Sequence, residues 1–543
     1  MSHKLSESIN CRSSAIFSSL QADCITTFFD HSVNCPDALA VAIDGDDWSY
    51  GSLAGLARAI AQALIPSACA PRVLIAMPPG AHAYAAMFAT GLAGGVYAPV
   101  NVRAPLAKRQ MVCSIFEPDV VIAPRRDWPL FEADGTERVY LDPCEMAPTS
   151  DIAVPHMPRH DLAYVIFTSG STGQPKGVEI SRSALNHYVA WLGNGLDLRQ
   201  NDRVSQYANI AFDLSVMEIY GALCHGASLH PPGGQGDRLL PARLIQREQL
   251  THWISVPSVV TLMQQADDLT ADNTRTVRRF VFCGEPLTPA HVSALFAAAP
   301  HALVQNTYGP TEATVSMTSL LLKASDLSSL TGATVPLGLP IPGMGMHLVG
   351  GPDANEGELV LTGPQLANGY FDDSTTTSGA FRILDTADGP QRAYFTGDWA
   401  IRVDGQIFFS TRVDFQVKHK GFRIELGELS AALIASGAAE ACVFSTDSTL
   451  VALIEVQATS GASPQTLRSS LISRLDLYAV PDDIVIVNRL PRNDNDKIDR
   501  GAAIELYRSG LGRSINQGRQ IADIHDLVNV PISKSNPKTA LNR

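Results

Sequence analysis

Short apolar runs alternate with segments of helical periodicity near the start of the chain. Apolar side chains recur at helical spacing over residues 53–64, and the apolar run 73–77 is closed by a Pro-Pro-Gly turn. The same pattern predicts a helix, a strand, a helix and a strand at residues 81–93, 95–100, 106–116 and 120–123. Buried strands separated by helices are typical of layered α/β folds, so we predict that class for the larger part of the chain.

The alternation continues to about residue 307, and the pattern changes beyond Pro340. Further elements are predicted within residues 207–226, 251–265, 279–283 and 303–307. Beyond Pro340, short apolar strands are separated by turns rich in Gly, Pro and Asp; they lie at residues 346–349, 357–361 and 407–409. This spacing predicts a small β-rich subdomain.

A smaller α+β unit follows, with a first strand at residues 415–419 and a turn at Lys420 and Gly421. A helix is predicted at residues 426–436, and strands at 441–444 and 451–455. We therefore expect a large N-terminal core over residues 20–413, a small C-terminal domain over 414–506 and a polar tail over 507–543.

The composition describes an ordinary globular protein. Of 543 residues, 45% are hydrophobic and 17% charged, and the net charge of -13 is spread without basic runs. This balance speaks against nucleic acid or an anionic membrane surface as a partner and favours a small substrate. The nine cysteines are scattered with no CxxC, the N-terminus lacks an apolar signal region, and no apolar run could span a bilayer. We expect a cytoplasmic protein without membrane insertion, disulfides or a zinc site.

The segment from Thr168 to Gly177 joins hydroxyls, glycines and one lysine in a turn directly after an apolar strand. Glycine lets backbone N–H groups approach an oxyanion, hydroxyls add donors, and Lys176 supplies a compact positive charge. This favours phosphate binding, with an ordinary polar turn as the alternative. A Walker loop is excluded because Lys176 stands between Pro175 and Gly177, which indicates a flap and not a rigid cradle.

A second polar segment, from Asn306 to Glu312, follows the predicted strand at residues 303–307. Ligands of open α/β sheets bind at such strand ends. Tyr308 can stack on a base, Thr311 can donate to a phosphate, and Glu312 can hold Mg²⁺. Asp398 follows a turn and can accept from ribose hydroxyls. The alternatives are a plain β-turn with a surface Glu, and an Asp that caps a turn.

Taken together, these segments resemble the adenylate-forming superfamily, in particular amino-acid adenylation domains and the stand-alone D-alanine:carrier-protein ligases. The resemblance runs from Trp48 to Arg500 and rests on an ordered series of motifs: Thr168 to Gly177, Phe212 to Glu218, Asn306 to Glu312, Gly357 to Leu361, Tyr394 to Asp398, Thr411 to Asp414 with Gly421 to Glu428, and Lys497. It implies an AMP-forming ligase that uses ATP and Mg²⁺ to make an aminoacyl-adenylate.

The resemblance also implies a role for each matching residue. Lys497 would bridge the substrate carboxylate and the charge near the α-phosphate, a task suited to an ammonium on a long stem. Thr168, Ser169 and Lys176 would bind the pyrophosphate portion, Glu312 Mg²⁺, Tyr308 adenine, and Asp398 with Arg412 the ribose. The whole nucleotide set adds Gly170, Thr172, Asn306, Gly309 and Thr311. Asp414 would be the hinge of a mobile C-terminal lid, closed for adenylation and opened to a thiol.

Two positions depart from the family pattern. The glycine that usually precedes the catalytic lysine is Asp496, which puts a carboxylate beside Lys497. The glycine that usually precedes the hinge-region arginine is Thr411. Neither change removes a catalytic group, and the first bears on the rate of adenylation.

The substrate pocket is predicted from the same motifs. Asp213 stands where similar enzymes hold a carboxylate for the α-ammonium of an amino acid. A buried Asp without a cation is costly, so its presence favours an amino acid over a fatty or aryl acid. The other positions are Phe212, Leu214, Met217, Ser255, Val281, Cys283, Gly284, Thr307, Val315 and Ser316. The bulky members leave room for a side chain near methyl size. Cys283 resembles a cysteine that selects the D-enantiomer in D-alanine ligases, although plain core packing also explains it.

Several functions therefore remain open. D-alanine is the favoured substrate, and the acceptor is expected to be a phosphopantetheinylated carrier protein in trans, because no LGGxS-type motif follows Arg500. The alternatives are L-serine, glycine or L-alanine in nonribosomal peptide biosynthesis, since Ser255 and Ser316 can meet a hydroxyl. An acyl-CoA ligase shares the expected fold but does not explain Asp213. A non-catalytic binding protein is suggested only by Asp496.

Overall fold

The computed structural model describes residues 23–65, 70–132, 135–149, 160–168, 174–412, 416–446, 449–456, 463–492 and 498–511. Packing divides the chain into two compact units. The first comprises the chain up to Glu428 together with Arg474–Ala479, and the second comprises Leu429–Ser473 and the chain from Val480 on. The hinge predicted at Asp414 lies outside the described residues. No helix among the described residues is long and apolar enough to cross a membrane.

The first unit contains a nine-stranded mixed sheet, sheet A. Its strand order is β15-β14-β13-β12-β11-β9-β10-β1-β2. The bounds are β1 Leu39–Ile43, β2 Asp46–Ser49, β9 Arg203–Ser205, β10 Ser228–His230, β11 His252–Ser255, β12 Arg279–Phe282, β13 Leu303–Tyr308, β14 Thr318–Leu322 and β15 Leu339–Pro340. Strands β1, β10, β9, β11, β12 and β13 pair in parallel, and antiparallel strands close both edges.

A second mixed sheet, sheet B, has the order β18-β8-β7-β4-β3-β5-β6. The bounds are β3 Arg72–Ile75, β4 Val96–Pro99, β5 Val120–Ile122, β6 Val139–Leu141, β7 Leu162–Thr168, β8 Lys176–Ser181 and β18 Gly369–Tyr370. The predicted phosphate loop joins β7 to β8, which pair antiparallel with Thr168 opposite Lys176. The loop therefore leads into a strand and not into a helix, consistent with the exclusion of a Walker loop.

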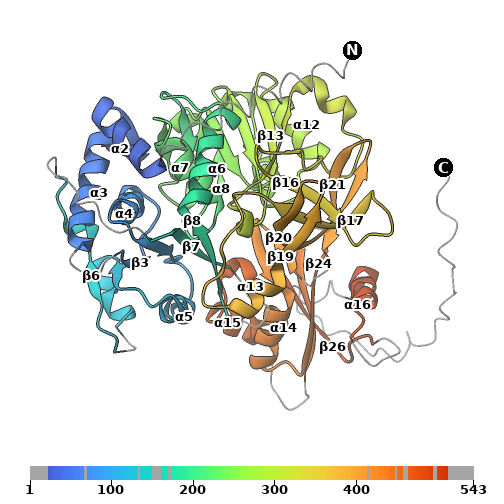
Figure 1. Ribbon diagram of the computed structural model, residues 1–543. Coiled ribbons are helices and arrows are strands. Elements are labelled where there is room, and N and C mark those ends of the chain that lie inside the picture. The colour runs from blue at the N-terminus through green and yellow to red at the C-terminus, as the bar shows by residue number, and fades with distance from the viewer. Residues whose placement is uncertain are drawn as a thin grey trace, which may run out of the picture. The chain divides into compact units, whose positions relative to one another are not determined.

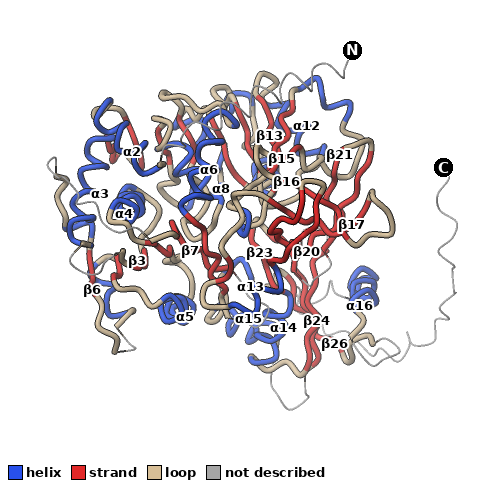
Figure 2. The backbone as a smooth tube through the Cα atoms, in the orientation of Figure 1, coloured by secondary structure: helices blue, strands red, loops and turns tan. Residues whose placement is uncertain are grey.

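The third sheet, sheet C, is the β-rich subdomain predicted beyond Pro340. It is formed by β16 Gly345–Val349, β17 Glu356–Thr362, β19 Phe381–Thr386, β20 Gly389–Val403 and β21 Gln406–Arg412. All its pairings are antiparallel, and Figure 2 shows these strands gathered around the long β20. A two-stranded hairpin follows, with β22 Gln416–His419 and β23 Phe422–Glu425 joined at the predicted Lys420–Gly421 turn.

Helices cover these sheets because their sequences supply both caps and apolar faces. Helix α3, Tyr50–Leu64, begins where the side chain of Ser49 accepts a hydrogen bond from the backbone N–H of Ser52, so it starts before the predicted residue 53. It lies beside α4, Ala81–Leu92, next to β3 (Figure 1). Helix α7, Leu214–Leu223, is buried along its whole length, as expected of a helix that is apolar all round.

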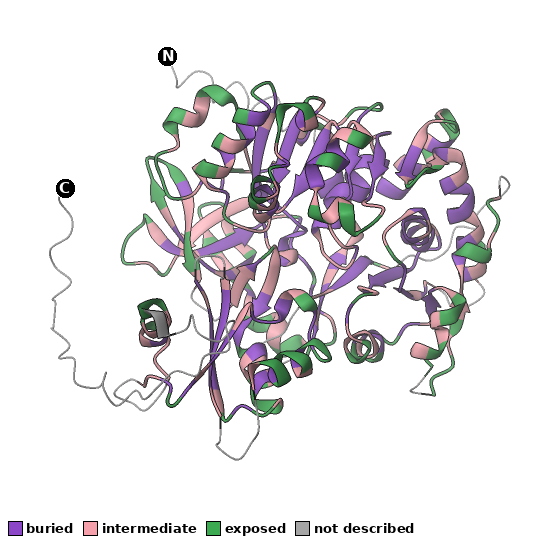
Figure 3. Cartoon of the chain, turned by 180° about the vertical axis from the view of Figure 1, so that it is seen from behind, coloured by how far each residue is buried: buried purple, intermediate pink, exposed green. Residues whose placement is uncertain are grey.

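The remaining helices of the first unit are α2 Cys24–Asn34, α5 Leu106–Phe116, α6 Arg182–Gly195, α8 Gln235–Leu239, α9 Pro241–Glu248, α10 Ser258–Gln265, α11 Ala271–Thr274, α12 Pro289–Ala298 and α13 Ser374–Ala380. The largest hydrophobic cluster joins α3, α4, α6 and α7 to strands of all three sheets. Figure 3 shows the buried residues concentrated on the strands and the inner helices. The predicted layered α/β class is confirmed.

The second unit is a small α+β arrangement. Helix α14, Leu426–Ala435, leads into it, and strands β24 Glu440–Thr446, β25 Thr449–Glu455 and β26 Asp483–Val487 form a three-stranded sheet. Helices α15, Pro464–Ile472, and α16, Arg500–Leu506, complete it. Its own hydrophobic core includes Phe444, Val451, Leu453 and Val485.

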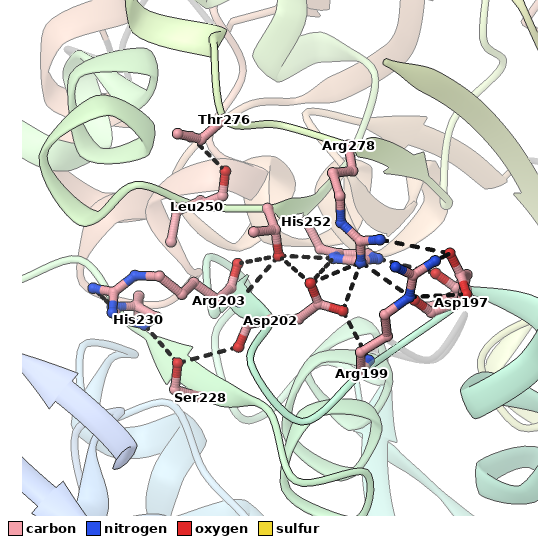
Figure 4. A network of polar contacts seen from close by, with 12 residues as sticks. Asp197, Arg199, Asp202, Arg203, Ser228, His230, Leu250, His252, Thr276 and Arg278 are labelled. Carbon is pink, nitrogen blue, oxygen red and sulfur yellow. Dashed lines mark hydrogen bonds and ion pairs between the residues drawn. The ribbon is translucent and has the colours of Figure 1, made fainter. Parts of the chain in front are cut away.

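A polar network stabilises the amino ends of the parallel strands of sheet A (Figure 4). The buried carboxylate of Asp202 accepts hydrogen bonds from Arg278 at 2.7 Å and from the hydroxyl of Thr251 at 2.9 Å. His252, the first residue of β11, lies 2.9 Å through its Nε2 from the carbonyl oxygen of Leu196 and is buried. Burial lowers the pKa of His252 to about 4, so the ring is neutral in the folded protein at neutral pH.

This pKa makes stability depend on pH. Between about pH 4 and the ordinary histidine pKa of about 6.5, His252 binds a proton in the unfolded chain but stays neutral in the folded protein. Stability is therefore full above that window and falls as the pH is lowered through it, by on the order of 3 kcal/mol. We expect urea midpoints, followed by fluorescence of the neighbouring buried Trp253, to fall from about pH 7.5 to about pH 5, and H252Q to show a smaller fall than the wild type. The exposed His301 gives the control H301Q, and an equal effect of both substitutions would contradict the assignment.

Candidate functional site

The carboxyl ends of β11, β12 and β13 bring predicted pocket residues together. These strands are parallel and in register, with Ser255 paired to Phe282 and Phe282 paired to Asn306. The hydroxyl of Thr307 donates to the carbonyl of Phe282 at 2.9 Å, and the backbone N–H of Cys283 donates to the carbonyl of Ser255 at 3.3 Å. This is the sheet edge at which open α/β folds bind ligands.

Asp213 precedes α7 and reaches the same place. Its Oδ2 accepts a hydrogen bond of 2.6 Å from the hydroxyl of Thr311, which follows β13. Among the described residues no cation forms an ion pair with Asp213. Burial raises the pKa of this carboxyl, and the hydrogen bond from Thr311 only partly opposes the rise. The site therefore holds a carboxylate that a cationic ligand group would stabilise.

The remaining predicted pocket residues are mostly apolar and buried. Leu214, Met217, Val281, Cys283, Val315 and Ser316 are buried, and Gly284 is partly buried. The two hydroxyls that the sequence offers to a substrate are already occupied. Ser255 accepts from the indole N–H of Trp253 at 2.9 Å and donates to the carbonyl of Val256, and Ser316 lies 3.0 Å from the hydroxyl of Tyr188. Both serine hydroxyls are thus already engaged by the protein, which leaves each of them only part of its hydrogen-bonding capacity for a substrate.

One part of this wall is a strained turn. Thr314 and Val315 have φ of 55° and 70°, although both are β-branched and this left-handed region disfavours them. A Cβ at Gly309 would lie 2.5 Å from the Cα of Ser316, so this glycine is required for the close approach of the turn. The carbonyl oxygen of Val315 lies 3.7 Å from the sulfur of Cys283. Such strain is typical of functional sites that the surrounding structure holds in place.

The predicted phosphate residues line a separate cavity of about 260 Å³. Thr168, Lys176 and Glu312 contribute to it, as the sequence predicted that they would lie together. Its other lining residues include the cations Arg382 and Arg423 and the aromatic residues Tyr370 and Tyr394. The lining also contains the carboxylates of Glu312, Glu358 and Glu425, and Arg423 is paired with Glu312, so Lys176 and Arg382 are the lining cations that suit the phosphate chain of a nucleotide.

The predicted adenine and ribose residues also lie together. The hydroxyl of the buried Tyr308 donates to Oδ2 of Asp398 at 2.6 Å, and Arg412 forms an ion pair with Oδ1 of the same carboxylate. The ammonium of Lys418 lies over the Tyr308 ring, 5.5 Å from its centroid. Asn306 donates to the carbonyl of Pro336 at 2.8 Å and thus fixes the end of β13.

Glu312, the expected Mg²⁺ ligand, is fully buried and already has partners. Its two carboxylate oxygens each lie 3.0 Å from Nη1 of Arg423, and Oε1 accepts a hydrogen bond of 2.6 Å from Tyr370. Burial alone would raise the pKa of Glu312, but Arg423 and Tyr370 outweigh it and hold the pKa below its usual value. The described residues contain no group of three or more His, Cys, Asp or Glu suited to a metal. In this arrangement Glu312 does not fit a metal ion.

Sequence reasoning missed part of this site. Arg423 stands in a motif that it identified, but no role was assigned to it, and Tyr370, Arg382 and Lys418 were not singled out. Tyr370, Arg382 and Lys418 lie on short strands, and the sequence pattern of a short strand does not show which residues its side chains contact. The predicted residues Ser169, Gly170, Thr172, Lys497 and Asp414 lie outside the described residues, as does Asp496.

Comparisons with known proteins agree with this geometry. The family model described as AMP-binding enzyme matches residues 28–371. The D-alanine–D-alanyl carrier protein ligase of Lactococcus lactis is 32% identical over 78% of this chain and 87% of the relative. The isonitrile lipopeptide synthase of Streptomyces coeruleorubidus is 34% identical over 87% of this chain, which spans 33% of that protein. The crystal structure of the Vibrio cholerae adenylation domain AlmE with glycyl-adenosine-5'-phosphate has a TM-score of 0.77 and 25% identity, and covers 90% of this chain and 98% of that one.

The surroundings of Cys283 predict an unreactive thiol. Burial raises its pKa to about 11, so roughly 0.03% is thiolate at about pH 7.5. We expect iodoacetamide to modify the exposed Cys144 long before Cys283, as measured by mass spectrometry of peptides. C144S and C283S each remove one site and identify the labelled peptides. Equal labelling rates at the two cysteines would contradict a buried, neutral role for Cys283.

Proposed function

The chain belongs to the AMP-binding enzyme family and is an AMP-forming adenylation enzyme, and on that premise we propose that it activates D-alanine and transfers it to a carrier protein. The acceptor is the phosphopantetheine thiol of a separate carrier protein. The observation that carries the proposal is the Asp213 carboxylate, which lies beside apolar residues. Among the described side chains, only Thr311 donates a hydrogen bond to it. A substrate α-ammonium supplies the missing cation, and neither a fatty acid nor an aryl acid does.

The pocket wall supports a substrate side chain of methyl size or smaller. Met217, Val281 and Val315 are each at most 1% exposed, and both pocket serines are engaged by the protein. A serine side chain would bury a hydroxyl that meets only their remaining hydrogen-bonding capacity, which is costly. The relatives named D-alanine–D-alanyl carrier protein ligases support D-alanine.

Glycine is the second candidate. The AlmE structure contains glycyl-adenosine-5'-phosphate, and it covers nearly the same length as this chain. A methyl group adds little discrimination in an apolar pocket, so the two substrates differ by a modest factor. An alternative is that the enzyme loads its amino acid onto a carrier protein of nonribosomal peptide synthesis. The likeness to the isonitrile lipopeptide synthase supports this alternative.

The residues divide the reaction between them. Asp213 orients the amino acid through its ammonium, so that a carboxylate oxygen attacks the α-phosphorus of ATP and pyrophosphate leaves. Lys176, from β8, and Arg382, from β19, attract the phosphate chain electrostatically. Lys497 is proposed to neutralise the developing charge at the α-phosphate. In the second step the carrier thiol attacks the acyl carbon, loses its proton and displaces AMP.

A panel of small amino acids tests the substrate. In ATP–pyrophosphate exchange we expect D-alanine to be fastest, glycine to follow within about 10- to 200-fold, and L-serine to be slower still. L-alanine tests the choice of enantiomer. Faster exchange with L-serine than with D-alanine would overturn the proposed substrate, and exchange with no amino acid would overturn the proposed function.

Substitution of Asp213 tests whether its carboxylate binds the ammonium group of the substrate. D213N removes the charge that holds the ammonium, so KM for the amino acid is expected to rise by about 100-fold or more while KM for ATP changes little. The raised pKa of Asp213 also predicts that kcat/KM for the amino acid falls on the acid side, because the protonated carboxyl loses its attraction for the ammonium.

A variant of Thr311 and a control at an exposed aspartate make this experiment more specific. T311V removes a hydrogen bond that lowers the pKa of Asp213, so it is expected to move the acid limb to higher pH, whereas D213N abolishes that limb. The exposed Asp404 gives the matched control D404N, which should behave as the wild type. An acid limb that persists unchanged in D213N would rule out this role for Asp213.

A further inference from the structure

The first unit contains a second cavity, of about 440 Å³, which shares no lining residue with the cavity of the predicted phosphate residues. This second cavity lies at the carboxyl ends of three neighbouring strands of sheet B. Met77 follows β3, Pro124 follows β5 and Asp142 follows β6, and all three residues line it. Neither the sequence motifs nor the proposed reaction gives this cavity a role.

The topology of sheet B makes this edge a position for a ligand. Strands β3 and β5 are parallel neighbours, but the chain leaves β3 toward β4 on one side and leaves β5 toward β6 on the other. At such a reversal of strand order the connecting segments diverge, and open α/β sheets bind ligands in the crevice beyond the strand ends. The volume also falls within the range of about 300 to 1,000 Å³ that is usual for small-molecule pockets.

The walls of the second cavity are largely apolar and stiff. Pro78 and Pro79 line it after β3, and a proline loses no side-chain freedom when it meets a ligand. Trp48 of β2 lines it as well, and its ring is held by two contacts. Its indole N–H donates to Asp46 at 3.0 Å, and its ring meets that of His82 edge-on at 5.2 Å. Rigid apolar walls with an aromatic ring suit a flat aromatic body.

The carboxylates of the lining already accept hydrogen bonds from the protein. Asp142 accepts from the backbone N–H groups of Arg125 and Cys144, at 2.8 and 2.9 Å. Asp46 accepts from the indole of Trp48. Both carboxylates thus have structural partners, which position the turn after β6 and the Trp48 ring.

The cationic residues of the lining differ in what they contact. Arg125 forms an ion pair with Glu145. The side chain of Arg126 is 85% exposed, lies 4.0 Å from the carboxylate of Asp127 and donates no hydrogen bond to a described residue. Burial lowers the pKa of His82, so this ring is neutral at neutral pH. Arg126 is therefore the charged group of the lining with the most capacity for a ligand.

We propose that the second cavity binds a small aromatic carboxylate, with its ring against Trp48 and the two prolines and its carboxylate at the guanidinium of Arg126. A guanidinium donates two parallel N–H groups to a carboxylate, which favours this anion over a neutral group of the same shape. The proposal goes beyond the proposed function and does not depend on it, because it involves neither ATP nor the residues around Asp213.

The exposed Cys144 lines the second cavity and reports whether it is occupied. The chain is alkylated with iodoacetamide at increasing 2-naphthoate, without ATP or amino acid, and mass spectrometry follows the Cys144 peptide. We expect a saturable slowing, by about 10-fold at ten times the Kd. The neutral 2-naphthamide is expected to bind about 5-fold more weakly or less well still. Labelling of Cys35, which does not line the cavity, should not change.

Substitution of Arg126 tests the charge. R126Q is expected to weaken 2-naphthoate about 5-fold or more and to leave 2-naphthamide unchanged, because only the acid pairs with the guanidinium. A general disturbance of the cavity would weaken both compounds alike. The exposed Arg275 lies outside the lining and gives the matched control R275Q, which should behave as the wild type. Circular dichroism and thermal unfolding establish that both variants are folded.

Each contrary result has a definite meaning. If 2-naphthoate does not slow the labelling of Cys144, the cavity is not the proposed site. Equal affinities for the acid and the amide, or an unchanged affinity in R126Q, would contradict the choice of an anion. Protection that persists with saturating D-alanine and α,β-methylene-ATP supports a separate site, whereas its loss would place 2-naphthoate at the adenylation site and overturn the proposal. ATP–pyrophosphate exchange decides the proposed function independently.

Discussion

A carboxylate removed from water must find a cation or keep a proton, and this requirement governs the arrangement of the whole site. Glu312 finds Arg423, so its pKa stays below the usual value although it is fully buried. Asp213 forms no ion pair with a described residue, and burial raises its pKa although Thr311 and the more distant Lys418 oppose the rise. The repulsion between the two carboxylates adds to that rise. The protein thus supplies an ion-pair partner for Glu312, whereas Asp213 has no such partner among the described residues. The surroundings alone shift the pKa values of these two carboxyl groups in opposite directions.

This division depends on segments that are far apart in the sequence. Asp213 precedes α7, Cys283 follows β12, and Glu312 follows β13, while Arg423 comes from the later hairpin. Parallel pairing of β12 and β13 brings the segments of Cys283 and Glu312 to one sheet edge, and the hydrogen bond from Thr311 links Asp213 to the same edge. The polar network around Asp202 holds the opposite ends of the same strands. Fixed internal partners therefore hold the amino ends of these strands, and the predicted site residues lie at the carboxyl ends.

Local patterns in the sequence predict part of this arrangement and not the rest. Strand and helix types followed from periodicity, whereas the grouping of Tyr308 with Asp398 at a nucleotide was implied only by the family resemblance. The ion pair of Glu312 was not predictable in this way, since Arg423 lies 111 positions away and only the folded hairpin brings it close. The same holds for Ser316, whose hydroxyl meets Tyr188 at a separation of 128 positions. Residue type suggested that Ser316 could meet a substrate hydroxyl. In the folded protein the Ser316 hydroxyl already contacts that of Tyr188.

The turn of Thr314 and Val315, beside Cys283, is held in a strained backbone conformation. Each β-branched residue in the left-handed region costs on the order of 1 to 2 kcal/mol, and Thr314 and Val315 are adjacent. The turn persists because its surroundings determine it. The hydroxyl of Thr314 donates to the carbonyl of Gln365 at 2.6 Å, and the backbone N–H of Met317 donates to the carbonyl of Tyr308 at 2.8 Å. The turn cannot move to admit a larger group without breaking those bonds. Under the proposed function, exclusion of larger side chains would rest on this backbone rigidity, whereas the difference between one methyl group and none would rest only on the few apolar contacts that the methyl makes.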